Sequence, residues 1–161
     1  MTPQAAPRRA DPPASPAAER ALIGSALLDY DRLATEGLYG LQSADFASPV
    51  HSLVWLGIER VAASQGPVGV ITVTAALAEM GELDRLDALL RPDTPEGYMV
   101  GCWADSWAVS GSSHWAKMIR EYAERRRAIA RGSAIVRDAH RGAVDEEPAI
   151  YDRDEYKGLD F

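Results

Sequence analysis

Apolar residues recur at intervals of three and four along most of the chain, which predicts helices that each bury one face. The strongest stripe follows Ser15, a suitable N-cap, and Pro16, which suits the first helical position because no N–H is needed there. Gly24 lies beside this stripe. Because a glycine inside a helix costs about 1 kcal/mol relative to alanine, we expect a close approach by a neighbouring helix at this position. The stripe itself consists of Leu22, Ile23, Ala26, Leu27 and Tyr30.

Five more helices are predicted before residue 113, most of them from a capping residue followed by apolar positions. Asp31 is expected to cap a short second helix, Ser48 a third and Thr72 a fourth. Leucines over 83–90 predict a fifth helix, and residues 96–109 predict a sixth.

In the sixth predicted helix, Met99, Trp103 and Trp107 follow one another at i, i+4 spacing. We interpret this stripe as core packing, because a base-stacking platform would be accompanied by nearby arginines. The short apolar segment 67–71 has no partner strand, so we interpret it as an extended connector. The pattern therefore predicts an all-α fold with a compact helical head over residues 16–113.

Residues 114–141 contain no proline and a single internal glycine, which predicts one long helix of about 40 Å. Apolar residues spaced seven apart on this helix indicate a seam for another helix, interrupted by an arginine. The candidate partner-binding residues are Trp115, Ile119, Tyr122, Arg126, Ile129 and Val136.

An alternative divides this set in two. Trp115, Ile119 and Tyr122 could instead pack on the protein's own head. Ile129 and Val136 are expected beyond the head, where apolar side chains would be exposed in a monomer and would favour a partner or self-association.

Charge is unevenly distributed along the 161 residues, which carry a net charge of −7. Residues 1–113 carry −7, residues 114–141 carry +5, and residues 142–161 carry −5. The basic helix offers phosphate contacts, although the overall acidity argues against nucleic acid as the main partner. The candidate nucleic-acid contacts are Arg120, Arg125, Arg127 and Arg131.

Both ends of the chain are expected to be disordered tails: residues 1–15 are rich in proline and alanine, and residues 142–161 are acidic. No apolar run approaches the roughly 20 residues that span a bilayer, and no signal-peptide pattern opens the chain, so we expect a cytoplasmic protein without membrane contact. The single cysteine, Cys102, excludes an internal disulfide.

Candidate catalytic chemistry is absent from the sequence pattern. The histidines and Cys102 lack metal-ligand spacing, and no nucleophile-elbow or Gly-x-x-x-x-Gly-Lys-Ser/Thr motif occurs. We therefore expect no catalytic residues, no metal and no cofactor, and a protein that is not an enzyme. His51 is expected to be a packing or capping residue, and not a ligand.

Taken in order, several short motifs resemble those of one family. The segments that carry the resemblance are Ala18-Glu19 with Leu22-Ile23-Gly24 and Leu27-Leu28-Asp29, Asp45-Phe46 with His51, Pro67-Val68 with Thr72-Val73, Gly81-Glu82-Leu83, and Trp115-Ala116-x-x-Ile119-x-Glu121 with Arg125-Arg126. Over residues 18–139 they are similar to the N-terminal domain of replicative DNA helicases of the DnaB type. Residues 96–113 match poorly, and the family's second hairpin arm and its motor domain have no counterpart in this sequence.

The resemblance implies an all-α, non-catalytic module of DNA replication that contacts a replicative helicase or a primase. Such a module would act as an adaptor, a loader or an inhibitor within a primosome, and would suit a phage or mobile element. Self-association through the long helix is a further expectation. Two alternatives are nucleic-acid binding by the arginine-rich helix and a truncated helicase relic without a function of its own.

Overall fold

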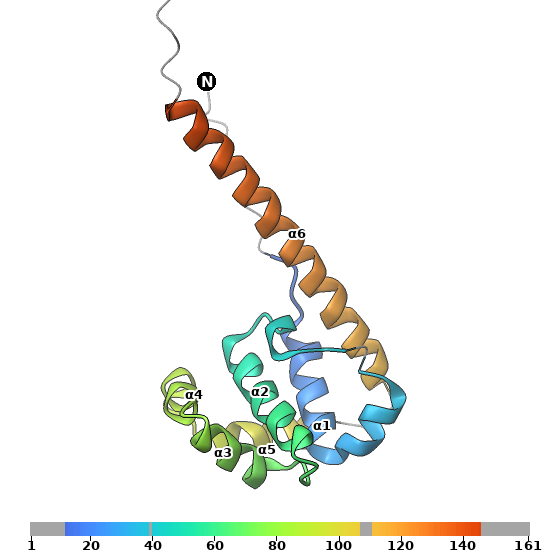
Figure 1. The fold of residues 1–161 in the computed structure, drawn as a ribbon. Coiled ribbons are helices and arrows are strands. Elements are labelled where there is room, and N and C mark those ends of the chain that lie inside the picture. Colours follow the sequence, from blue (N-terminus) through green and yellow to red (C-terminus); the bar gives the residue numbers. More distant parts are fainter. Residues whose placement is uncertain (1–11, 39, 107–110, 146–161) are drawn as a thin grey trace, which may run out of the picture. The chain divides into compact units, whose positions relative to one another are not determined.

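The computed structural model describes residues 12–38, 40–106 and 111–145, with side chains described as far as residue 142. These residues form six α-helices and one 3-10 helix, and they include no strand, so the all-α prediction is confirmed (Figure 1). No helix among the described residues is long and apolar enough to cross a membrane. The elements are α1 (Pro16–Glu36), η1 (Ser43–Asp45), α2 (Pro49–Ala63), α3 (Val70–Glu79), α4 (Leu83–Leu90), α5 (Pro95–Asp105) and α6 (Ser112–Asp145).

Two predicted helix starts are confirmed. The Ser15 hydroxyl accepts a hydrogen bond from the backbone N–H of Ala18, and the Ser48 hydroxyl accepts one from His51. In both helices a proline follows the cap, as the sequence predicted.

Two other predicted starts are wrong. The second helix is present but begins two residues earlier than predicted: α1 joins two helical segments across a kink at Asp29, whose backbone is not helical and whose carboxylate accepts from the N–H of Arg32. Asp29 therefore does the capping that was assigned to Asp31. The N-cap of α3 is Gly69, and Thr72 lies one turn later, where its hydroxyl accepts from the N–H of Gly69.

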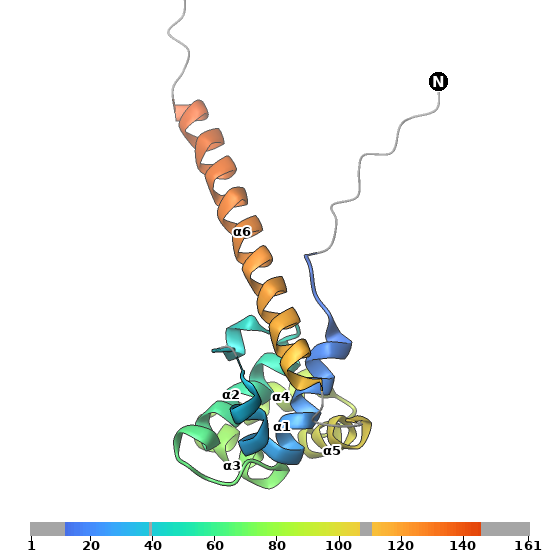
Figure 2. The ribbon, with the colours of Figure 1, turned by 90° about the vertical axis from the view of Figure 1, so that its right-hand side faces the viewer.

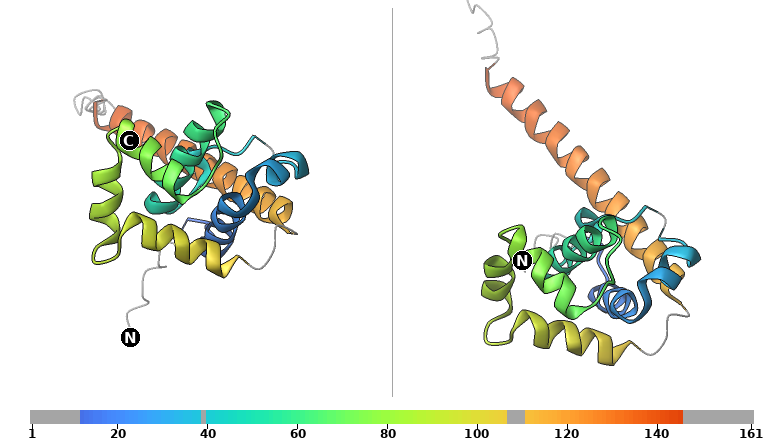
Figure 3. Two further views of the ribbon diagram at one scale, coloured as in Figure 1. Left: turned by 90° about the horizontal axis from the view of Figure 1, so that it is seen from below. Right: turned by 60° about the horizontal axis from the view of Figure 1, so that its bottom comes forward.

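The helices of the head share one apolar core. Helix α2 packs against α1, α3 and α4, and α5 packs against the same three helices, most extensively against α1. Figure 2 shows α1 beside the start of α6, and both views of Figure 3 show α5 along one edge of the head. The largest fully buried side chains include Trp55, Leu22, Ile23, Ile58 and Met99.

Gly24 lies where α1 and α5 cross. A Cβ atom added to Gly24 would lie 2.8 Å from the backbone carbonyl carbon of Cys102. It would lie equally close, at 2.8 Å, to the Cβ atom of Ser106 on the same facing segment. Glycine therefore lets the two backbones meet, which confirms the close approach expected from its position in the apolar stripe.

The stripe predicted for the sixth helix divides between core and surface. Met99 is fully buried, but Trp103 is 48% exposed, so the expectation that it packs in the core is wrong. The buried position next to it is taken by Cys102. Trp107 lies outside the described residues, and so do residues 1–11 and 146–161 of the two expected tails.

The chain divides into two compact units within α6, between Arg126 and Arg127. We call the described residues up to 126 the head unit, and residues 127–145 the outer helix. The head unit thus includes the first turns of the long helix, which was expected to span residues 114–141 within the same domain as the head.

Candidate functional site

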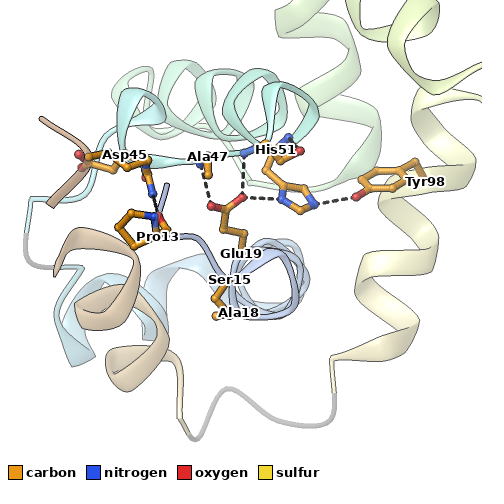
Figure 4. A network of polar contacts seen from close by, with 10 residues as sticks. Pro13, Ser15, Ala18, Glu19, Asp45, Ala47, His51 and Tyr98 are labelled. Atoms are coloured by element: carbon orange, nitrogen blue, oxygen red, sulfur yellow. Dashed lines mark hydrogen bonds and ion pairs between the residues drawn. The ribbon is translucent and has the colours of Figure 1, made fainter. Parts of the chain in front are cut away.

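A buried polar network joins three elements of the head unit (Figure 4). The Glu19 carboxylate on α1 accepts hydrogen bonds from the backbone N–H groups of Ala47, at 2.7 Å, and Ser48, at 3.2 Å. It also lies 2.8 Å from Nδ1 of His51 on α2. The other ring nitrogen of His51 lies 2.7 Å from the hydroxyl of Tyr98 on α5.

The proton positions in this network follow from its chemistry. A carboxylate accepts, so the His51 Nδ1 that faces Glu19 is the protonated nitrogen. Burial raises the pKa of Tyr98, so its phenol keeps its proton, and the phenol oxygen lies within hydrogen-bond distance of Nε2 of His51.

Glu19 and His51 are almost completely inaccessible, with exposed fractions of 1% and 4%. A substrate in solution cannot reach them, so the network is suited to fixing helices rather than to acid–base catalysis. Its hydrogen bonds offset the cost of burying a carboxylate. This result agrees with the interpretation of His51 as a packing or capping residue.

Arg126 joins the last head turn of α6 to two other segments. Its guanidinium donates to the backbone carbonyl of Pro13, at 2.8 Å, and to that of Asp45. The interruption in the predicted seam is thus explained, because Arg126 bonds within the head unit and not along a seam.

The neighbouring seam residues also belong to the head unit. Ile119 is buried in the core together with Ala116, and Trp115 packs against the same core. Tyr122 is partly exposed, and the Arg125 guanidinium lies over its ring, 5.7 Å from the ring centre. In this structure Ile119 and Trp115 pack on the head, which was the alternative considered for them.

The outer helix presents the most exposed apolar face of α6. Ile129, Ile135 and Val136 have exposed fractions of 54%, 70% and 56%. At about 3.6 residues per turn these three residues fall on one side of the helix, with Gly132 between them. A Cβ atom added to Gly132 would meet nothing within 4 Å, so this side is open. We call Ile129, Gly132, Ile135 and Val136 the outer face.

Ile135 was missed by the sequence reasoning, which followed a strict seven-residue spacing from Trp115 to Val136. The signal was present, because Ile135 directly precedes Val136 and lies three residues after Gly132. It lies sixteen residues beyond the buried Ile119, which corresponds to about 160° around the helix.

The four candidate nucleic-acid contacts differ in their surroundings. Arg120 forms an i,i+4 ion pair with Glu124 at 3.4 Å, and Arg125 lies over Tyr122. Arg127 and Arg131 are exposed on the outer helix. Helical geometry places Arg127 on the side opposite Ile129, whereas Arg131 lies one turn before Ile135 and borders the outer face.

Two further titratable groups have perturbed surroundings. Cys102 is fully buried, and burial raises the pKa of its thiol to about 11, which makes it a poor nucleophile. Burial also raises the pKa of Glu59, although its carboxylate accepts a hydrogen bond from the N–H of Ser43. Within the described residues no group of three or more His, Cys, Asp or Glu side chains could hold a metal ion.

A family model described as the DnaB-like helicase N terminal domain matches residues 11–91, which is half of the chain. The chain belongs to this family. The family resemblance inferred from the sequence motifs is thereby confirmed, and the matched region includes Glu19, His51 and the segment between them. The match ends before α5, the region that resembled the family least in the sequence.

Two proteins similar to this family member come from mycobacteria. The replicative DNA helicase DnaB of Mycobacterium leprae is 28% identical over 143 residues, which cover 88% of this chain and 22% of the helicase. The crystal structure of the N-terminal domain of DnaB helicase from Mycobacterium tuberculosis has a TM-score of 0.70 and 27% identity, covering 82% of this chain and 89% of that domain. The chain thus spans 22% of the length of the curated helicase that it matches, and the similarity extends past α4 into α5 and α6.

Proposed function

We propose that this DnaB-type N-terminal domain is a non-catalytic interaction module of DNA replication, which docks on a replicative helicase or a primase through the outer face of α6. It would act there as an adaptor, a loader or an inhibitor. The family membership supports the replication context. The similarity to the N-terminal domain alone, together with the lack of a phosphate-binding loop in these 161 residues, supports the non-catalytic role.

The observation that carries this proposal is the exposure of Ile129, Ile135 and Val136 on one side of a helix. Fully burying an aliphatic side chain of this size is worth about 1.5–3 kcal/mol, so covering the exposed parts of three of them contributes substantially to the binding free energy. A helix that presents such a stripe is suited to a helical groove or to pairing with another helix.

The test compares two charge substitutions at exposed apolar sites. The double variant I129D/V136D alters the outer face, and I71D alters Ile71 on α3, which is 84% exposed and serves as a matched control. Binding of the full chain to purified helicase and to purified primase is measured for the unaltered protein and both variants. We expect at least about a tenfold loss of affinity in I129D/V136D, equivalent to about 1.4 kcal/mol, and none in I71D.

Circular dichroism shows whether each variant keeps its helices. Unchanged binding of a folded I129D/V136D variant would contradict the assignment of the outer face. Failure of the unaltered protein to bind either partner would contradict the proposed function as a whole.

A second candidate function is nucleic-acid binding, which is favoured by the exposed Arg127 and Arg131. Phosphate contacts release counterions, so affinity would fall steeply as salt concentration rises. Substituting Arg127, which lies away from the outer face, with glutamine would then weaken binding to DNA while leaving binding through the outer face unchanged.

A further inference from the structure

The apolar stripe of helix α5 is wider than the part of it that the core covers. Met99 and Cys102 lie in the core, where both are fully inaccessible. Next to them around the helix, Trp103 and Val100 are 48% and 49% exposed. Apolar side chains that lie side by side on a surface point to a partner that covers them.

The exposed residues of α5 form a continuous strip along one edge of the head. Gly97, Val100, Trp103 and Ala104 are separated by one, three or four positions, so they lie on one face over the length of the helix. Figure 3 shows α5 at this edge in both views. We call these four residues the α5 strip. By contrast, the exposed Ile71 on α3 is a single apolar residue, which is common on protein surfaces.

Acidic residues border the strip at both of its ends. Glu96 precedes it, and Asp105 follows it. Across residues 79–105 the sequence has seven acidic residues and only two arginines. Each of these arginines is already paired with a carboxylate one turn away: Arg85 with Glu82, and Arg91 with Asp87.

A cation on the neighbouring helix α1 is also paired. Arg20 on α1 lies over the Tyr98 ring and forms an ion pair with Asp105 at 2.9 Å. Asp93 and Glu96 form no ion pair with any residue that the structure describes. The surface around the strip therefore carries an excess of negative charge that attracts a basic partner.

We propose that the α5 strip binds a basic amphipathic helix of a partner protein. Aliphatic side chains of that helix would cover Val100 and Trp103, and the small residues Gly97 and Ala104 allow its backbone to approach closely. Its lysines or arginines would meet the carboxylates of Glu96 and Asp93. A cation at this position would also interact favourably with the half-exposed Trp103 ring.

This second docking surface lies entirely in the head unit and does not depend on the outer face of α6. A molecule with both surfaces can hold two proteins together, which fits an adaptor better than a simple blocking protein. Failure of the strip to bind would leave the proposed function intact, because the two surfaces are tested with different variants.

The test uses a fluorescent synthetic amphipathic helix composed of leucine and lysine, and a twin in which glutamate replaces lysine. Each peptide is titrated with the full chain at physiological salt, and binding is followed by fluorescence anisotropy. The variants are V100S/W103S, which removes the apolar strip, E96K, which reverses a bordering charge, and I71S, which removes an exposed isoleucine elsewhere on the head.

We expect the lysine peptide to bind the unaltered protein and I71S equally well, and to bind V100S/W103S at least about tenfold more weakly. E96K should weaken binding by a smaller factor, and the glutamate peptide should not bind. Equal binding to V100S/W103S, or equal binding of both peptides, would overturn the proposal. So would self-association of the chain that V100S/W103S abolishes, because the occupant would then be a second copy.

Hydrogen exchange on the unaltered protein gives an independent reading if V100S/W103S fails to fold. The lysine peptide should slow exchange of α5 amides and leave those of α3 unchanged. Protection that is absent from α5, or equal on both helices, would contradict a site on the strip.

Discussion

Gly24 offers the sharpest test of the packing between α1 and α5. Replacing it with alanine adds one methyl group that would lie 2.8 Å from two atoms of the facing segment, where ordinary contacts begin at about 3.4 Å. One of these atoms belongs to the Cys102 backbone, which cannot rotate away as a side chain would. The helices must therefore separate by a substantial fraction of an ångström, at the cost of the core contacts around them.

The size of the effect follows from two opposing contributions. Overpacking a tight core costs about 1–3 kcal/mol and occasionally more, and a clash with backbone belongs at the upper end. Alanine recovers up to about 1 kcal/mol of helix propensity. We expect G24A to lower the free energy of unfolding by about 2–3 kcal/mol, which corresponds to roughly 4–12 °C in Tm for a chain of this size.

Gly132 provides the matched control, because a Cβ atom added there meets nothing within 4 Å. The same glycine-to-alanine change should therefore leave stability unchanged or raise it by up to about 1 kcal/mol. Both variants are compared with the unaltered protein by urea and thermal denaturation, followed by circular dichroism. A G24A variant as stable as the unaltered protein would refute the close approach of α1 and α5.

Three further predictions concern buried titratable groups. E19Q should lower the free energy of unfolding by about 2–4 kcal/mol in urea denaturation, because an amide replaces a buried carboxylate that accepts from two N–H groups and His51. The control E36Q alters an exposed ion pair on the same helix and should change the free energy of unfolding by less than about 1 kcal/mol. Equal effects of the two variants would contradict the network. Because burial raises the pKa of Glu59, its ionisation opposes folding, so the stability of E59Q relative to the unaltered protein should increase as pH rises from acid to neutral, and a flat difference would contradict the assignment. Burial raises the pKa of the Cys102 thiol to about 11, so with rising pH the thiol loses its proton in the unfolded chain before it does in the folded protein; stability should therefore fall between about pH 9 and 11 in the unaltered protein and less so in C102A. Labelling of this thiol at about pH 8 should require unfolding. Rapid labelling of the native protein would contradict the burial of Cys102.

The parts of the fold that the sequence predicted correctly depend on local chemistry. Ser15 and Ser48 were identified as caps because a hydroxyl before a proline-led helix is a short-range signal. Gly24 was identified because a glycine inside an apolar stripe weakens its helix, a cost that a close approach by a second backbone offsets. Asp29 and Gly69 were missed, since a nearby acid or threonine offers the same local signal a few residues away.

The parts that failed depend on contacts between distant segments. Glu19, His51 and Tyr98 lie on three helices, and no spacing within the sequence indicates that their side chains meet. Trp103 was misplaced because its spacing of four from Met99 puts both on one stripe but does not indicate where the core ends, and the core covers Met99 and Cys102 while leaving Trp103 half exposed. Ile119 fits a seam equally well whether its partner is the head or another protein, so only the structure could decide between them.

The measurement that most directly tests the central claim is light-scattering mass after size exclusion, for the chain alone and mixed with the replicative helicase of its source. The proposed function predicts a mixed complex of defined mass that forms with the unaltered protein and with I71D, and not with a folded I129D/V136D variant. A chain that elutes at its own mass beside the helicase, and equally beside the primase, would contradict it.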